Sequence, residues 1–464
     1  MDTQPTTPLP DAGGAAAVAA PLPPLTTKPA AERLVSLDVF RGITIAGMIL
    51  VNNPGSWGNL FSPLAHATWN GLTPTDLVFP FFLFIVGVAL PFSFDRRIAD
   101  GASRLRLFEH VVRRTIIILV LGLLMAAFPR WPALQTWPAW QLALPYIAVI
   151  VGLAFLFVDE PPLSWPKLTA PRVRKLISWL LLAGAVGLFI YNFGAFEESK
   201  LRVPGVLQRI ALCYFFASVI VMLGGVTFRV LCVVALLLGY WAIMTYCHAP
   251  DGYQMPDAAA RPEGLLHDWI DVKLLGVHLY KERPDPEGLL STVPAVATVL
   301  LGVLTGGWLR TTREKRDRVG WLFLAANVLL VIGLWVALTM PLNKKIWTSS
   351  YVLVTGGLAM HFLAACFWLI DVHGYRGWAR PFLIFGTNAI AVYFASSVGA
   401  KLLMSWSVHL ADGQTLTVQK FLYDTYLASW AAPKVASLLY ALAYVAVWCV
   451  LMWPLYRLRI FIKI

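Results

Sequence analysis

Charged side chains are scarce in this chain. Only 13% of its 464 residues are Asp, Glu, Lys or Arg, whereas 58% are hydrophobic and 13% are aromatic. Soluble proteins carry about 25% charged residues, so this composition excludes a soluble enzyme. It predicts instead an all-α, polytopic integral membrane protein built as a bundle of apolar helices.

Cysteines are also few, and their spacing excludes the sites that cysteines usually build. No two show the paired spacing of a zinc, haem or redox site, and all fall in or beside apolar runs: Cys213, Cys232, Cys247, Cys366 and Cys449. We therefore expect no metal. The formal net charge is +12, but no basic and aromatic nucleic-acid module accompanies it. We expect the basic residues to set topology and to meet membrane lipid, and we expect no nucleic-acid partner.

Apolar runs of about 17 to 25 residues predict about 12 transmembrane helices after a disordered cytoplasmic tail over residues 1–32. The membrane domain covers 33–464, with spans at 36–53, 76–94, 111–128, 140–158, 173–193, 206–223, 227–246, 291–309, 319–340, 351–370, 381–402 and 435–456. Arg and Lys gather in alternate loops. By the positive-inside rule, both termini are then cytoplasmic, and the loop between the first two spans lies on the outer face.

That loop holds an unusual group of polar residues. The run is His66-Ala-Thr-Trp-Asn-Gly-Leu-Thr-Pro-Thr-Asp76, which brings a base, an indole, an amide and a carboxylate to the mouth of a membrane helix. An imidazole beside a carboxylate can move protons, although an interfacial histidine can also be purely structural. Asp76 is in addition a candidate N-cap of the second span. We predict that His66 and Asp76 are catalytic.

Both ends of the first span carry polar residues. Asp38 and Arg41 are three apart on one helix face, so they either fix the helix at the inner interface or hold Arg41 toward an anionic cosubstrate. At the other end, Asn52 and Asn53 reach the outer mouth. They lie near His66 if the connecting loop folds back.

Five motifs in the same order resemble those of the heparan-α-glucosaminide N-acetyltransferases and their bacterial relatives. They are Leu37-Asp-Val-Phe-Arg-Gly, the run from His66, Asp76-Leu-Val-Phe-Pro, Leu201-Arg-Val-Pro-Gly-Val-Leu-Gln-Arg and Asn343-Lys. The resemblance implies an acyltransferase of the bacterial inner membrane that passes an acetyl group from cytoplasmic acetyl-CoA to an amino sugar in the periplasm. It also implies that the family's active-site histidine falls on His66, its asparagine on Asn52 or Asn53, and its acid on Asp76.

The residue types suit that chemistry. An imidazole can take the proton that a sugar amine must lose before its nitrogen attacks a thioester; it can also attack first and carry the acetyl group itself. We favour His66 as a base in direct transfer. Amide donors for the developing oxyanion are Asn52, Asn53 and Asn70.

Further basic and polar residues are candidates for binding the two substrates. For the phosphates of CoA we single out Arg41, held by Asp38; the other basic candidates on that side are Arg97, Arg113, Arg114, Arg376 and Arg380. For the acceptor, amino sugar or glycan, we expect contacts from Trp69, Asn70, Arg202, Gln208, Arg209, Asn343 and Lys344. A second copy of the chain is a further candidate partner.

Two other functions fit the same sequence. Polar groups inside a bundle of twelve spans also describe a secondary transporter, for instance of N-acetylglucosamine. An acyltransferase that modifies hydroxyls of an envelope glycan would use His66 in the same way. The halves of the chain show no convincing internal repeat, which favours the enzyme over the transporter.

Overall fold

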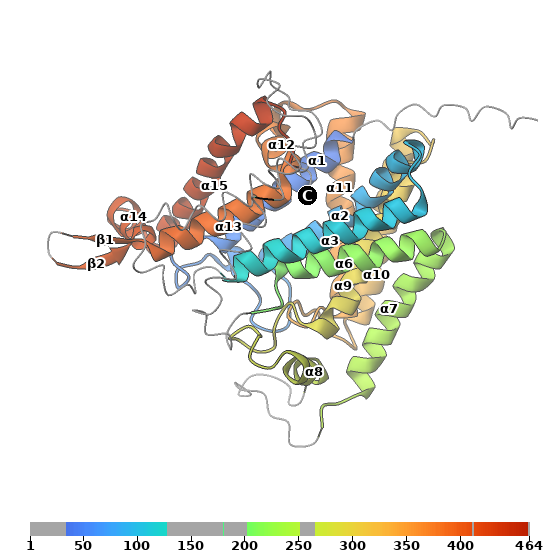
Figure 1. The fold of residues 1–464 in the computed structure, drawn as a ribbon, viewed down its shortest axis with the longest axis horizontal. Coiled ribbons are helices and arrows are strands. Elements are labelled where there is room, and N and C mark those ends of the chain that lie inside the picture. The colour runs from blue at the N-terminus through green and yellow to red at the C-terminus, as the bar shows by residue number, and fades with distance from the viewer. Residues whose placement is uncertain (1–33, 128–179, 181–201, 251–264, 411–412, 463–464) are drawn as a thin grey trace, which may run out of the picture. The chain divides into compact units, whose positions relative to one another are not determined.

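A computed structural model describes residues 34–127, 180, 202–250, 265–410 and 413–462 of the chain. Within this part, residues from Leu34 onward form one compact unit made of long helices and one short hairpin (Figure 1). Eight of the described helices are long and apolar enough to cross a membrane, and a bent pair makes a ninth. The prediction of an all-α polytopic membrane protein is confirmed.

Helices occur at ten of the twelve places where the sequence predicted spans. The helices of the first half are α1 (Val35–Asn52), α2 (Pro74–Ala99), α3 (Arg104–Ala127), α6 (Val206–Leu223) and α7 (Val226–Tyr246). Those of the second half are α9 (Leu289–Leu309), α10 (Lys315–Val336), α11 (Ser349–Phe367), α12 (Arg380–Thr387) with α13 (Ala389–Ser405), and α15 (Pro433–Arg457). The spans predicted at 140–158 and 173–193 lie outside the described residues, except for Leu180, so the total of about 12 remains a prediction.

Short elements join these helices. The loop after α1 contains η1 (Ser62–Leu64), and α8 (Leu266–Leu275) precedes α9. After α11 come the π-helical turn η5 (Trp368–Val372) and the turn η6 (Gly377–Ala379). Between α13 and α15 lie the antiparallel strands β1 (Ser407–His409) and β2 (Thr415–Thr417), then α14 (Val418–Tyr423) and η7 (Asp424–Ala428).

Among the described helices, α2 packs extensively against α9, and glycines make this contact close. A Cβ on Gly87 would lie 1.9 Å from the carbonyl oxygen of Val299, and one on Gly302 would lie 2.1 Å from that of Phe84. Small residues at such crossings let two membrane helices approach each other. This contact fixes α2, whose first turn carries Asp76, against α9.

One predicted span is not a single straight helix. The run 381–402 was expected to cross the membrane without interruption, but α12 and α13 meet at Asn388 with a bend of 76°. The Asn388 amide binds the C-terminal segment: its Nδ2 donates to the carbonyl of Ile460 at 3.0 Å, and its Oδ1 accepts from the amide of Ile462 at 2.7 Å. Bonds to a distant backbone stabilise this break, which explains why hydropathy alone missed it.

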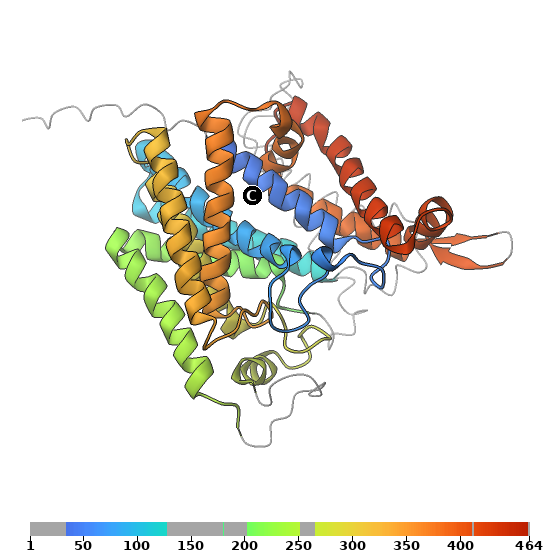
Figure 2. The same cartoon turned by 180° about the vertical axis from the view of Figure 1, so that it is seen from behind.

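The functional loops meet at one end of the helix bundle. The last turn of α1 and the first turns of α2 and α6 lie there, together with the loops that lead into α9 and α11 (Figure 2). We call this the His66 end. The opposite end, where α2 ends and α3 begins, is called the far end.

Candidate active site

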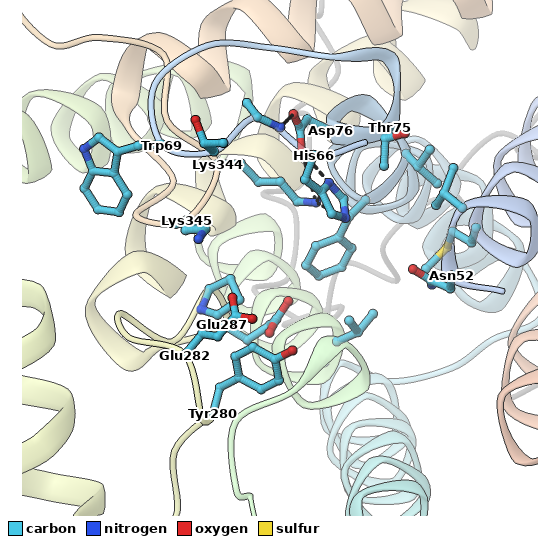
Figure 3. A pocket seen from close by; sticks show the side chains of 18 of the residues that line it. Asn52, His66, Trp69, Thr75, Asp76, Tyr280, Glu282, Glu287, Lys344 and Lys345 are labelled. Atoms are coloured by element: carbon cyan, nitrogen blue, oxygen red, sulfur yellow. Dashed lines mark hydrogen bonds and ion pairs between the residues drawn. The ribbon is translucent and has the colours of Figure 1, made fainter. Parts of the chain in front are cut away.

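A cavity of about 440 Å³ lies at the His66 end. Five separate stretches of chain line it: the last turn of α1, residues 66–79, the segment that leads into α6, the loop before α9 and the loop before α11 (Figure 3). Its apolar floor consists of Met48, Val51, Val78, Phe79 and Val206. Its volume falls within the range of pockets that hold small molecules.

His66 and Asp76 form a pair inside this cavity. The Nδ1 of His66 lies 2.7 Å from Oδ1 of Asp76, and the imidazole side chain is 44% exposed whereas the carboxylate is 1% exposed. A buried carboxylate that accepts the Nδ1–H holds the imidazole in the tautomer whose Nε2 carries a lone pair. The structure therefore brings together the two residues that the sequence singled out, in an arrangement that suits a general base or a nucleophile.

The hydrogen bonds around Asp76 fix its side chain. Its Oδ2 accepts from the amide of Ala67 at 3.1 Å, and from the amide and hydroxyl of Thr73 at 3.1 and 2.9 Å. The phenol of Tyr351, on α11, donates to the Asp76 carbonyl at 2.6 Å. The prediction that Asp76 is the N-cap of α2 is wrong, because Thr73 is the N-cap. Asp76 lies three residues later, and its side chain accepts a hydrogen bond from the backbone amide of Thr73.

Lys344 is the cation beside this pair. Its Nζ lies 3.0 Å from Nδ1 and 3.4 Å from Nε2 of His66, and 3.4 Å from Oδ1 of Asp76. Burial lowers the pKa of Lys344 below the usual lysine value, while the Asp76 carboxylate acts in the opposite direction. The next residues anchor its loop: Trp347 is buried at a φ of 54°, and its Nε1 donates to Oγ1 of Thr298 at 3.2 Å.

The wall opposite His66 carries carboxylates. Tyr280, Glu282 and Glu287 face the cavity from the loop before α9 (Figure 3). Arg202 ties this loop to the start of α6, because its guanidinium binds Asp285 at 3.1 Å through Nε and also contacts Glu287. Burial would lower the pKa of Arg202, but the carboxylates of Glu287 and Asp285 raise it above its usual value.

Sequence reasoning missed this wall. Its residues Tyr280, Glu282, Asp285 and Glu287 were not among the candidates, although three carboxylates within six residues just before an apolar span were a visible signal. Of the charged residues in the wall, only Arg202 was predicted. The cavity consequently has a cationic side, with Lys344 and Lys345, and an anionic side.

The other predicted residues divide into those that line the cavity and those that support it. Asn52 and Trp69 line it. Asn53 is buried and donates from Nδ2 to the Ile49 carbonyl of its own helix at 2.7 Å. Asn343 donates to Oδ1 of Asn70 at 3.2 Å, which joins the loop of Lys344 to that of His66.

Gln208 and Arg209 do not line the cavity. Arg209 is buried, donates to the Gly288 carbonyl at 2.9 Å and lies 5.1 Å from the ring centroid of Trp347. It therefore supports both the carboxylate wall and the Lys344 loop. Gln208 is also buried, and its amide atoms have no hydrogen-bond partner among the described residues.

Asp38 and Arg41 lie at the other end of α1 from Asn52. Nη1 of Arg41 is 3.1 Å from Oδ1 of Asp38 and 3.3 Å from the Gly386 carbonyl of α12. Eleven residues separate Arg41 from Asn52, about 16 Å along an α-helix. Contact with a cosubstrate at Arg41 stays a prediction. In the described part of the chain, no three His, Cys, Asp or Glu side chains are grouped to hold a metal ion.

Comparison with known proteins gives two kinds of match. A family model described as "Domain of unknown function (DUF5009)" matches residues 33–239. The chain is 27% identical over 417 residues to the human protein named heparan-alpha-glucosaminide N-acetyltransferase. This alignment covers 79% of this chain and 53% of the human protein. The chain is 25% identical over 492 residues to the mouse protein of the same name, covering 95% of this chain and 62% of that protein.

The chain thus spans between half and two thirds of the length of these curated relatives. The matched part includes the helices that form the cavity, since the mouse alignment covers nearly the whole chain. The resemblance predicted from the five sequence motifs is confirmed: this chain is similar to the human and mouse proteins named heparan-alpha-glucosaminide N-acetyltransferase.

Proposed function

We propose that this protein transfers an acetyl group from acetyl-CoA to an amino sugar, with the two substrates reaching the cavity from opposite sides of the membrane. The observation that carries the proposal is the His66–Asp76 pair, 2.7 Å apart, in a cavity of about 440 Å³. The printed names of both curated relatives, which are N-acetyltransferases of a glucosaminide, support the reaction class.

In this proposal the acceptor ammonium first releases one proton to water, and His66 accepts the second proton from the amine nitrogen as it attacks. The amine nitrogen attacks the thioester carbonyl carbon, the C–S bond breaks, and the proton from His66 neutralises the CoA thiolate. Asp76 keeps the Nδ1–H of the imidazole in place so that Nε2 is the reacting atom. Asn52 and Lys344 line the cavity, and we assign them as donors to the oxyanion.

The two charged sides of the cavity suit an amino-sugar acceptor. Glu282 and Glu287 attract the ammonium form of the amine into the cavity that His66 also lines. Trp69 supplies an aromatic surface for a sugar ring. The proposed orientation has the His66 end in the periplasm and the far end in the cytoplasm of a bacterial inner membrane, as the distribution of basic residues predicts.

The deciding experiment uses the purified chain in proteoliposomes. Acetyl-CoA with a labelled acetyl group is supplied on one face, and glucosamine on the other. Labelled N-acetylglucosamine on the glucosamine side supports the proposal, and His66→Ala should abolish it in equally well-folded protein. Unmodified glucosamine that crosses the membrane would instead indicate a transporter, and label on a hydroxyl would indicate an O-acyltransferase.

A second measurement separates direct transfer from an acyl-enzyme. The protein is incubated with labelled acetyl-CoA without acceptor and then examined by peptide mass analysis. Direct transfer predicts no stable label on His66. An acetyl group trapped on the imidazole would show that His66 attacks first.

A further inference from the structure

A group of basic side chains between the last turn of α2 and the middle of α3 does not line the cavity. Arg97 lies in the last turn of α2, and Arg113 and Arg114 lie on α3. We call these three residues the arginine cluster. The groups that act electrostatically on Arg97 are Tyr214 and the arginines at 96, 113 and 114. Among these described residues there is no carboxylate to balance the charge.

Arg114 is the most unusual member of the arginine cluster. Its guanidinium carbon lies 4.7 Å from the ring centroid of Tyr214, a buried residue in the middle of α6. Its Nε is buried and, within the described part of the chain, has no hydrogen-bond partner. A buried cationic donor within a membrane helix is costly unless it binds something, so it points to a function.

Other arginines at the far end do have partners. Arg310 pairs with Asp95, Nε of Arg229 donates to the Gly224 carbonyl at 3.1 Å, and Arg318 donates to the Leu309 carbonyl at 2.5 Å. An ordinary topology-setting arginine can therefore be satisfied by the protein here. Arg97 differs because the charged groups that act on it are arginines, and Arg114 differs because its buried Nε has no hydrogen-bond partner among the described residues.

We propose that Arg97 and Arg114, the latter over the ring of Tyr214, form a binding site for a phosphate group between the last turn of α2 and the middle of α3 and α6. Guanidinium groups bind phosphate oxygens through paired hydrogen bonds, which would satisfy the free Nε of Arg114 and offset the repulsion among the arginines. The phosphate comes from the nucleotide end of CoA or from an anionic phospholipid. The CoA assignment rests on the proposed function, whereas the phosphate chemistry does not.

The position along α6 agrees with CoA as the source. Val206, in the cavity floor, and Tyr214 are on the same helix, eight residues apart. This separation is about 12 Å at the 1.5 Å rise per residue of an α-helix. An extended pantetheine arm can bridge such a distance. A phosphate held at Arg114 would then leave the thioester close to the floor beneath His66.

Binding to the full-length protein tests the site without relying on turnover. His66→Ala protein in nanodiscs of zwitterionic lipid is titrated with CoA by calorimetry, with and without Arg97→Gln or Arg114→Gln. We expect each substitution to weaken CoA binding about tenfold, which corresponds to one charge-assisted pair. Arg104→Gln, an exposed arginine in the first turn of α3, is the matched control and should bind CoA as the parent does.

The second arm tests phospholipid. Retention of phosphatidylglycerol by the detergent-solubilised protein is measured by native mass spectrometry. Loss of retained lipid in both cluster variants, with CoA binding unchanged, assigns the phosphate site to lipid; loss of CoA affinity assigns it to CoA. Arg114→Lys keeps the charge and serves as a second variant if Arg114→Gln does not fold. Cluster variants that bind both ligands as Arg104→Gln does would overturn the proposal, whatever the result of the transfer assay.

Discussion

Nζ of Lys344 lies 3.0 Å from Nδ1 of His66, although 278 residues separate them in the chain. The contact places a cation beside the imidazole and its carboxylate. It depends on the loop between α10 and α11 reaching the loop between α1 and α2, which the bond between Asn343 and Asn70 maintains.

Replacing Asp76 by Asn should slow transfer by about 10²-fold or more, because the imidazole loses the carboxylate that orients its Nδ1–H. The substitution also removes a charged partner of the N-cap amide, which costs about 1 kcal/mol of stability. Steady-state rates with acetyl-CoA and glucosamine, alongside thermal unfolding, measure the two effects.

Thr73→Ala is the matched control for this change. It removes the hydroxyl that donates to Asp76 at 2.9 Å and leaves the His66–Asp76 pair intact. Stability should fall by a similar amount while the rate stays within a few-fold of the parent. Equal losses of rate in both variants would mean that Asp76 only caps α2.

Replacing Lys344 by Met should lower kcat/KM by about tenfold or more, since the cation beside His66 is then unavailable to the developing oxyanion. Lys345→Met changes a neighbouring cavity-lining cation and should have a smaller effect. Rates are measured at saturating acetyl-CoA with varied glucosamine. An unchanged kcat/KM in Lys344→Met would remove Lys344 from the reaction.

The sequence predicts the helices and the central pair because both are local. Apolar runs determine where a membrane helix forms, and His66 and Asp76 are ten residues apart at one helix mouth. The bend at Asn388 could not be predicted in this way, since the bonds that stabilise it come from Ile460 and Ile462. Hydropathy at 381–402 is the same for a straight helix and a bent one.

The carboxylate wall is absent from the sequence prediction for a similar reason. Arg202 and Asp285 are 83 residues apart, and their pairing decides that the loop before α9 turns toward the cavity. An exposed loop and a cavity wall have the same composition. Only the tertiary contact distinguishes Glu287 as a lining residue from an ordinary surface acid.

Replacing Arg202 by Met should destabilise the protein by about 3 kcal/mol, because Asp285 is fully buried and would lose its cation. The wall should also loosen, so KM for glucosamine should rise more than kcat falls. Thermal unfolding and steady-state kinetics measure both effects.

Lys420→Met is the control for Arg202→Met. It breaks the exposed ion pair in which Nζ of Lys420 lies 2.7 Å from Oδ2 of Asp424. The free energy of unfolding should fall by less than about 1 kcal/mol. If Arg202→Met is as stable as Lys420→Met, the buried pair does not hold the wall in place.

Stability should also depend on pH through Asp271, which packs behind the carboxylate wall on α8. Burial raises the pKa of this carboxyl from its ordinary value to about 7, although it accepts a hydrogen bond from the Leu289 amide at 2.8 Å. Its neighbour His267 is 3.7 Å away and has its pKa lowered to about 4 by burial, so it stays neutral in the same range.

Because the folded protein holds the Asp271 proton more tightly than the unfolded chain does, the stabilisation is complete below about pH 4 and is lost as the pH rises through about 7. The unfolding temperature should therefore fall between pH 5 and 8. Asp271→Asn keeps an oxygen for the Leu289 amide and cannot ionise, so its unfolding temperature should change less over this interval. A parent and a variant with parallel pH profiles would show that Asp271 is already ionised in the folded protein at pH 5, and that other groups account for the slope.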